Sequence, residues 1–434
     1  MTVKSPTLEG FDQERWSEAV TTIARPTRSR IISGSVIMLI GSTLVSLLNF
    51  AYNIAVARML GPAEFSHAAA AVTLLMLVSA VTLSFQLVCA KFVAKNETVA
   101  GRAAVYQALR RKAWIVGLAS GCGLVVFSDL IQTYLRLPST TLVILLAAGI
   151  TFYIPLGVTR GALQGSCSFG RLSANFALEA TVKLVGAVVL ISSGMGVIGA
   201  VIAIALSVVV AYFLPPVPEG LRTTPGPSIP ASFREGMQAI IFFVGQVLIN
   251  NVDILMVKHF FPPRDAGVYA AIALVGRVLY FASWSVVSAM FPISAGAKES
   301  ERDKSVILIP LLAVTAISVA FVLVLRIFPD FILKSVFGSE FHGEQILPLL
   351  SMYATAAAAY ALSAVLMAYE MSRKIANTAW LQLVFSGFVM LGIAIFHDSL
   401  RHVVTVQQVL GVLLLAAVST PFLLNRLKRI RGAA

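Results

Sequence analysis

The chain has 434 residues, of which 58% are hydrophobic and 12% are charged, and its mean hydropathy is +0.87. A soluble domain averages roughly 45–50% apolar and about 25% charged residues. This composition therefore excludes an ordinary globular core and indicates a chain that folds in lipid. The formal net charge of +13 would suit a nucleic-acid-binding protein. The distribution of the basic residues along the chain therefore has to show whether the charge reflects membrane topology or nucleic-acid binding.

Apolar stretches long enough to cross a bilayer as helices recur along the whole chain. A hydrocarbon core of ~30 Å needs about 20 apolar residues per helical crossing, whereas barrel strands would give alternating segments of about ten residues. The first stretch is long enough to cross, so we expect an uncleaved helix and no signal peptide. The sequence predicts an all-α polytopic membrane protein with twelve spans, at 34–57, 66–90, 113–131, 141–160, 173–193, 197–214, 237–260, 267–291, 305–328, 344–368, 375–397 and 403–424.

The basic residues are unevenly distributed between the predicted loops. With the N-terminus in the cytoplasm, 24 of the 33 Lys and Arg residues fall inside, 7 fall outside, and Lys183 and Arg277 lie within spans. Cytoplasmic loops of membrane proteins carry such an excess. We therefore predict a protein of the cell (inner) membrane with both termini cytoplasmic, part of whose charge attracts anionic lipid headgroups.

A proline-rich stretch, PPVPEGLRTTPGPSIP at 215–230, divides the chain near its middle, and proline disfavours helix interiors. The halves resemble each other at an offset of 201, which aligns residues 47–49 with 248–250. Six spans per half predict a parallel repeat whose lobes enclose a cavity with alternating access. The predicted units are a cytoplasmic tail (1–33), an N-lobe (34–214), a linker (215–236), a C-lobe (237–424) and a basic tail (425–434).

Two stretches carry a family pattern: LLNFAYNIAVARMLGPAEF at 47–65 and LINNVDILMVKHFFPPRDAGVYAAIALVGRVLY at 248–280. Together with 160–186 and 328–350, they resemble the polysaccharide-exporter flippases of the multidrug/oligosaccharidyl-lipid/polysaccharide (MOP) transporter superfamily. The resemblance spans about 31–424. It implies a V-shaped pair of six-helix lobes, like the multidrug exporters of the superfamily, and movement of a lipid-linked saccharide. Twelve spans depart from the fourteen of the lipid II flippases in this superfamily.

Arg277 is the first candidate for substrate binding, because a charged side chain in mid-membrane is costly. It lies ~15 Å into its predicted span at a rise of about 1.5 Å per residue. Its planar guanidinium can bind two phosphate oxygens at once, and the resemblance also implies a basic cavity. No acidic residue lies three or four positions away, whereas Tyr280 does. The alternative is a salt bridge to another helix, with Glu179 or Asp253.

Glu179 and Lys183 stand four residues apart in the fifth predicted span, on one helix face. One interpretation is a pair that neutralises itself within the helix. The other places both side chains in the cavity, with Lys183 on a phosphate and Glu179 tuning its charge or taking a proton. The sequence leaves both interpretations open.

Polar side chains form stripes at helical steps of three and four residues, which place each stripe on one helix face. The stripe of the first predicted span consists of Ser42, Ser46, Asn49 and Asn53. The stripe of the seventh consists of Gln246, Asn250 and Asp253, and Gln86 lies in the second span. The amide side chains can hydrogen-bond sugar hydroxyls, or they can hold helices together by hydrogen bonds. Asp253, near the end of the seventh span, can instead form a salt bridge between helix ends. The predicted cavity-lining set is Arg277, Lys183, Glu179, Asn250, Asp253, Asn49, Asn53, Gln86, Gln246 and Tyr280.

Other motifs have structural explanations. The segment 194–199 matches GxGxxG, but it joins two spans, so an external turn fits better than a dinucleotide loop. Gly157, Gly161 and Gly165 form a small-xxx-small repeat that indicates close helix packing. No cysteine pair has CxxC spacing and no P-loop sequence occurs, so we expect no metal, no cofactor and no enzymatic activity.

The leading hypothesis is a flippase that moves a lipid-linked oligosaccharide or polysaccharide precursor from the cytoplasmic to the outer leaflet. Its headgroup phosphates would bind a basic cavity between the lobes. The expected partners are the lipid-linked saccharide, membrane lipids, and a polysaccharide polymerase or glycosyltransferases, without nucleic acid. The alternative is a cation-coupled multidrug exporter of the same superfamily, although the first span lacks the acidic residues that cationic drugs favour. A membrane-embedded glycosyltransferase and a scaffold protein are further alternatives.

Overall fold

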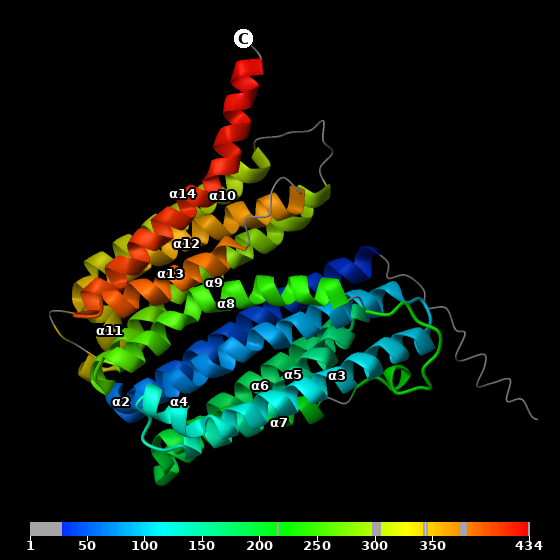
Figure 1. Cartoon of the computed structure of the whole chain (residues 1–434), viewed down its shortest axis with the longest axis horizontal. Coiled ribbons are helices and arrows are strands. Elements are labelled where there is room, and N and C mark those ends of the chain that lie inside the picture. Colours follow the sequence, from blue (N-terminus) through cyan, green and yellow to red (C-terminus); the bar gives the residue numbers. More distant parts are fainter. Residues whose placement is uncertain are drawn as a thin grey trace, which may run out of the picture.

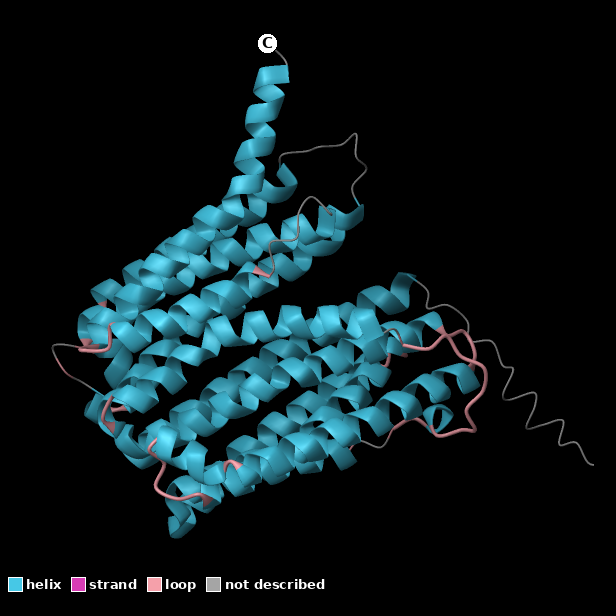
Figure 2. Cartoon of the chain, viewed as in Figure 1, coloured by secondary structure: helices cyan, strands magenta, loops and turns pink. Residues whose placement is uncertain are grey.

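The computed structural model of the chain describes residues 28–214, 217–231, 233–296, 305–341, 343, 346–373 and 380–432. Regular structure in this part of the chain is almost entirely helical, and short loops join the helices (Figure 2). This confirms the predicted all-α class. Six helices form the N-terminal half: α2 (Arg28–Lys95), α3 (Val99–Val126), α4 (Ser128–Tyr134), α5 (Thr141–Gly165), α6 (Phe169–Leu190) and α7 (Gly196–Phe213).

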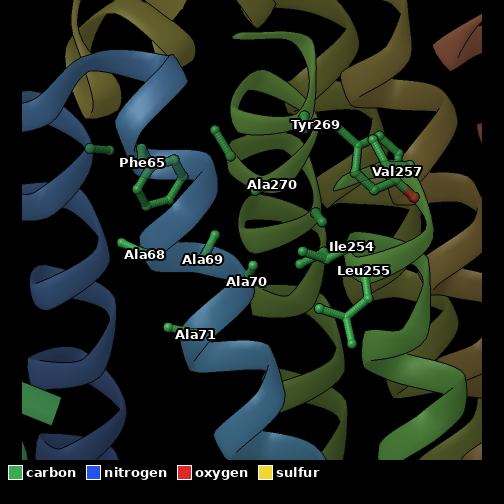
Figure 3. Close-up of a cluster of buried hydrophobic side chains, with 14 of the residues drawn as sticks. Phe65, Ala68, Ala69, Ala70, Ala71, Ile254, Leu255, Val257, Tyr269 and Ala270 are labelled. Atoms are coloured by element: carbon green, nitrogen blue, oxygen red, sulfur yellow. The ribbon is translucent and has the colours of Figure 1, made fainter. Parts of the chain in front are cut away.

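Helix α2 is two membrane crossings joined at a break. Its 68 residues would extend ~100 Å as one straight helix, far more than a bilayer core of about 30 Å. The break falls at Gly61, whose φ of 71° is accessible mainly to glycine, and Pro62 then removes a backbone donor. The two halves of α2 lie side by side (Figure 3), as the predicted spans 34–57 and 66–90 require.

The link between α6 and α7 is a tight turn. A short π-helix at Ile191–Met195 connects them, with Gly194 at φ 89° and Gly196 at φ 54°. Both glycines therefore adopt the left-handed backbone that residues with a side chain disfavour. The GxGxxG match is a turn between two spans, as predicted.

The helices of both halves account for most of the predicted crossings. The bent pair α3–α4, with an angle of 62° between its members, fits one further predicted crossing of the N-terminal half. Eight helical stretches of the described residues are long and apolar enough to cross a membrane, and two of these, with 60 and 45 residues, are long enough to cross twice. The helices of the C-terminal half are α8 (Phe233–Phe260), α9 (Pro263–Gly296), α10 (Ser305–Ile327), α11 (Pro329–Phe337), α12 (Leu347–Arg373), α13 (Leu381–Ile395) and α14 (Leu400–Gly432).

The two halves form separate lobes (Figure 1). Helices α2 to α7 make the N-lobe and α8 to α14 the C-lobe. The ribbons of the lobes converge at the end where α2 breaks and α11 lies, and they diverge toward the end where the linker lies. This arrangement is the V-shaped pair of lobes that the sequence resemblance implies.

Helices α2 and α5 pack closely inside the N-lobe because α5 presents three glycines to its neighbour. A Cβ atom at Gly157 would lie 2.5 Å from the carbonyl oxygen of Thr82, and Gly161 and Gly165 face the next turns of α2 in the same way. Small residues let helix backbones approach in a membrane. The small-xxx-small repeat is therefore a packing motif, as predicted.

The linker is attached to the N-lobe over residues 217–231. Leu221 is buried in an apolar cluster with side chains of α2, α3 and α5. The side chain of Asn96, at the end of α2, accepts a hydrogen bond from the backbone N–H of Ile229 at 3.0 Å, and the Gln107 amide donates to the carbonyl of Thr223 at 3.0 Å. The linker thus follows the N-lobe surface instead of hanging between the lobes.

One apolar contact surface joins the lobes where they converge, and we call it the closed seam. Figure 3 shows the second half of α2 beside α9 and α8, with Ala69 and Ala70 on the side of α9 and Ala68 and Ala71 on the side of the first half of α2. Alanines at these positions allow the close approach of the helices. The closed seam is formed by Phe65, Ala69 and Ala70 of α2, Ile254, Leu255 and Val257 of α8, and Ala270 of α9.

Polar contacts also cross between the lobes near the closed seam. Lys258, only 1% exposed, donates to the hydroxyl oxygen of Ser66 at 2.7 Å. Arg58 Nε donates to the carbonyl oxygen of Val336 in α11 at 2.8 Å. The first contact satisfies a charged donor that the closed arrangement shields from water, whereas Arg58 is exposed.

Candidate functional site

Asp253 in α8 is a buried carboxylate with several donors. It is 2% exposed, and its Oδ2 accepts hydrogen bonds from the hydroxyls of Tyr269 (2.9 Å) and Tyr353 (3.0 Å) and from the amide of Gln407 (3.0 Å). The donors come from α9, α12 and α14. Sequence analysis missed them, because none of them belongs to a run of polar residues at helical spacing and none is charged.

Arg277 in α9 lies beside this carboxylate without forming a hydrogen bond to it. Its Nη2 is 3.9 Å from Asp253 Oδ1, which is within ion-pair range but too long for a hydrogen bond. Arg277 Nε and Nη2 and Asp253 Oδ1 have no hydrogen-bond partner in the described part of the chain. Of the two salt bridges that the sequence left open, the structure contains the one to Asp253.

A pocket opens beside Arg277 inside the C-lobe. It encloses about 600 Å³, including its open mouth. Five helices, α8, α9, α12, α13 and α14, contribute its walls, so the pocket lies within one lobe, whereas the sequence led us to expect a cavity between the two lobes. Its polar lining consists of Asn250, Arg277, Tyr280, Tyr353, Tyr360 and Gln407, and its apolar lining includes Ile249, Phe385, Val389 and Leu414.

The polar stripe of α8 leads into this pocket. Asn250 lines it and donates from its amide to the backbone carbonyl of Gln246 at 2.8 Å. The Gln246 amide in turn donates to the hydroxyl oxygen of Tyr280, another lining residue. Among the predicted residues, the structure therefore groups Arg277, Asn250, Asp253, Gln246 and Tyr280 at one site.

The charges of the N-lobe form a separate cluster. Glu179 pairs with Arg160, its Oε2 lying 2.5 Å from the guanidinium Nη2, and Arg160 Nε donates to Asn175 Oδ1 at 2.7 Å. The expectation of a self-neutralising pair of Glu179 and Lys183 is therefore wrong, because an arginine on α5 binds the glutamate instead. Arg160 is the last residue of the predicted span 141–160 and was counted among the 24 basic residues on the inside, but it is 2% exposed within α5, which continues to Gly165.

Lys183 of α6 contacts the first half of α2. Its Nζ donates to Asn49 Oδ1 and lies 5.2 Å from the centre of the Tyr52 ring. The Asn53 amide donates to the backbone carbonyl of Asn49 at 2.8 Å. The first-span stripe thus binds α6 in this structure, apart from the Arg277 pocket, and its part in transport stays a prediction.

Gln86 holds two helices of the N-lobe together. Its amide donates to the Oε1 atom of Gln164, at the end of α5, at 3.1 Å. This is the helix–helix contact that the sequence offered as the alternative to sugar binding.

A family model identifies the chain. The profile of a family described as "Polysaccharide biosynthesis protein" matches residues 55–344, which is more than half of the chain. The chain belongs to this family. No curated protein matches the sequence.

Solved structures with the same fold include transporters of the MOP superfamily. An inward-facing multidrug resistance MATE family transporter of this superfamily matches with a TM-score of 0.71 and 16% identity, covering 91% of this chain and 97% of that one. The lipid II flippase MurJ, in an inward closed conformation, matches with a TM-score of 0.73 and 11% identity over 89% and 87%.

A third structure belongs to a MOP superfamily transporter from Pyrococcus furiosus, for which a reversed polarity of the binding pocket is described; it matches with a TM-score of 0.55 and 16% identity over 92% and 95%. At these identities the likeness concerns the fold. Together with the family match, it confirms the sequence resemblance to the MOP superfamily and the multi-pass membrane architecture.

Proposed function

We propose that this polysaccharide biosynthesis family member is a flippase that carries a lipid-linked oligosaccharide or polysaccharide precursor from the cytoplasmic to the outer leaflet, and that Arg277 binds a headgroup phosphate. The family description and the transporter fold support a role in saccharide transport. The likeness to a lipid II flippase supports a lipid-linked substrate.

The observation that carries the proposal is the unequal bonding of Asp253 and Arg277. Three donors already satisfy Asp253 Oδ2, whereas Arg277 Nε and Nη2 have no hydrogen-bond partner and the residue lines the pocket. Both nitrogens are buried in this arrangement, and a phosphate that reached the guanidinium from the pocket would leave the hydrogen bonds of the aspartate in place. Such a contact is charge-assisted and can use two parallel N–H donors.

The rest of the pocket suits an uncharged, hydroxyl-rich group. The amides of Asn250 and Gln407 and the hydroxyls of Tyr280 and Tyr360 line it, and each can both donate and accept hydrogen bonds. A sugar next to the phosphate would bind these groups, while the lipid chain stays in the bilayer. Asp253 would limit the negative charge that the pocket tolerates.

Transport would follow from rocking of the lobes about the closed seam. Placing the diverging end in the cytoplasm agrees with the excess of basic residues in the predicted inner loops. The described arrangement would then admit substrate from the cytoplasmic side, in a cell membrane and with both termini inside. Release on the outer side would require the closed seam to open, in the manner of paired lobes that alternate access.

The test compares Arg277→Gln, Arg277→Lys and the double variant Asp253→Asn/Arg277→Gln at matched expression. The measurement is the outer-leaflet exposure of the lipid-linked saccharide in cells. We expect R277Q to abolish export and R277K to retain part of it. Lysine keeps the positive charge but lacks the two parallel N–H donors of the guanidinium.

The double variant separates binding from folding. It removes both charges, so it restores stability if R277Q merely leaves Asp253 unpaired, yet export should remain absent. The control is Arg326→Gln, at an exposed arginine of α10. Normal export by R277Q would show that this pocket does not bind the substrate.

A cation-coupled exporter is the second candidate, and the unbonded Asp253 Oδ1 favours it. A buried carboxylate oxygen without a donor can bind a proton or a cationic drug. In that case overexpression should raise drug resistance, D253N should abolish the increase, and saccharide export should not depend on either residue. The nearby Arg277 opposes cation binding, which is why the flippase is preferred.

A further inference from the structure

A second basic site lies away from the Arg277 pocket, where the linker crosses α3. A groove of about 760 Å³, including its open mouth, runs between the first half of α3 and the turn of the linker. Leu221, buried in the N-lobe, fixes the linker side of the groove, and the bond from Gln107 to the linker backbone fixes the α3 side. The lining residues are Tyr106, Gln107, Arg110, Arg111, Trp114, Leu221 and Arg222.

The groove carries three positive charges, and no carboxylate is among its lining residues. Arg110 is held in place, since its Nε and Nη2 both donate to the hydroxyl oxygen of Tyr212, at 3.2 and 2.9 Å. Arg111 and Arg222 are exposed, and no side-chain hydrogen bond or ion pair of theirs occurs within the described ranges. The groove thus presents two uncommitted guanidinium groups beside a fixed one.

Aromatic residues mark the level of the groove in the membrane. The Trp114 ring lies 5.3 Å from that of Phe152 and 5.5 Å from that of Tyr212. Trp and Tyr concentrate where lipid headgroups meet the hydrocarbon core. One turn further along α3, Ile115 and Leu118 are 62% and 50% exposed, so an apolar surface begins directly below the arginines.

We propose that this groove binds the phosphate of an anionic phospholipid headgroup, with its acyl chains along the apolar surface of α3. The guanidinium groups suit phosphate oxygens, and basic residues at the membrane surface attract anionic lipids. The bound phosphate would join the linker, through Arg222, to α3, through Arg111. The site is separate from the Arg277 pocket, and its existence does not depend on the proposed transport function.

The experiment measures lipid binding to the full-length protein in a neutral detergent by native mass spectrometry, with phosphatidylglycerol and phosphatidylcholine as probes. Arg111→Gln/Arg222→Gln is the test variant, because neither side chain forms a hydrogen bond to another described residue. Arg264→Gln/Arg401→Gln is the control, with the same loss of charge at two exposed arginines outside the groove. We expect phosphatidylglycerol affinity to fall about tenfold in the test variant only.

Four outcomes would overturn the proposal. An equal loss in the test and control variants would show general attraction to a basic protein, and no loss in the test variant would show that the groove is unoccupied. Phosphatidylcholine binding as strongly as phosphatidylglycerol would remove the need for an anionic headgroup. Displacement of the lipid by millimolar inorganic phosphate would assign the groove to a soluble phosphate instead. Saccharide export by R111Q/R222Q is a separate readout, so a failure here leaves the Arg277 proposal intact.

Discussion

Breaking the buried ion pair between Arg160 and Glu179 should destabilise the N-lobe strongly. The two side chains are 3% and 13% exposed and lie 2.5 Å apart, so Glu179→Gln would leave a buried guanidinium that retains Asn175 and the Phe176 ring, 4.0 Å away. Removing one partner of a buried pair costs about 3–5 kcal/mol. The remaining contacts to Arg160 favour the lower end of that range.

A double-mutant cycle measures this cost. E179Q, R160Q and the double variant R160Q/E179Q would be compared by thermal unfolding of the solubilised protein, followed by loss of the monodisperse species. We expect the double variant to be at least ~2 kcal/mol more stable than the sum of the single effects, because it leaves no unpaired charge. The control is Lys334→Gln, which breaks the exposed pair with Asp330 and should cost at most about 1 kcal/mol.

Two results would refute this reasoning. If E179Q unfolded within about 1 kcal/mol of the wild type, the pair would not be buried as described. If the double variant were as unstable as the sum of the single variants, the two residues would not act on each other. Loss of saccharide export by a stable E179Q protein would instead point to a direct role of Glu179 in transport.

Three further predictions follow from other parts of the structure. Asp253→Asn should tighten binding of inorganic pyrophosphate at Arg277 about tenfold, measured by calorimetry, because it removes a nearby negative charge; unchanged affinity would contradict the assigned pocket. Gly161→Leu should abolish folded protein in a size-exclusion assay, since α2 leaves no room for the side chain, whereas Gly123→Leu, with open space around it, should fold normally. Cysteines at Ser66 and Lys258, joined by a short reducible cross-linker, should stop export until reductant is added; export through the cross-linked protein would show that the closed seam need not open.

Much of the fold was predictable, because each crossing needs its own apolar stretch and its own turn chemistry. The breaks at Gly61 and Gly194 fall between predicted spans, and the glycine repeat of α5 correctly marked a close helix contact. Lipid forces backbone hydrogen bonds into helices, so hydropathy alone locates most elements. Boundaries were less certain, as α3 starts at Val99 and not near 113, because its polar first turns lie outside the apolar window.

Pairing of charges was not predictable from spacing. Glu179 and Lys183 share one face of α6, but spacing along a helix does not show which side chain the next helix offers. Arg160 lies at the end of a predicted span in the sequence but is buried inside the N-lobe. It forms the salt bridge to Glu179, which spacing along the helix would assign to Lys183. The partner of Arg277 was likewise left open until α8 and α9 were placed against each other.

Attachment of the linker sets a length limit on the motion of the lobes. The backbone of Ile229 is bonded to Asn96 at the end of α2, and α8 begins at Phe233. Four residues of chain extend at most ~14 Å, so the first turn of α8 stays tethered near the N-lobe however far the C-lobe rotates. Lengthening this tether by a few glycines would change how wide the transporter opens while leaving every binding residue in place.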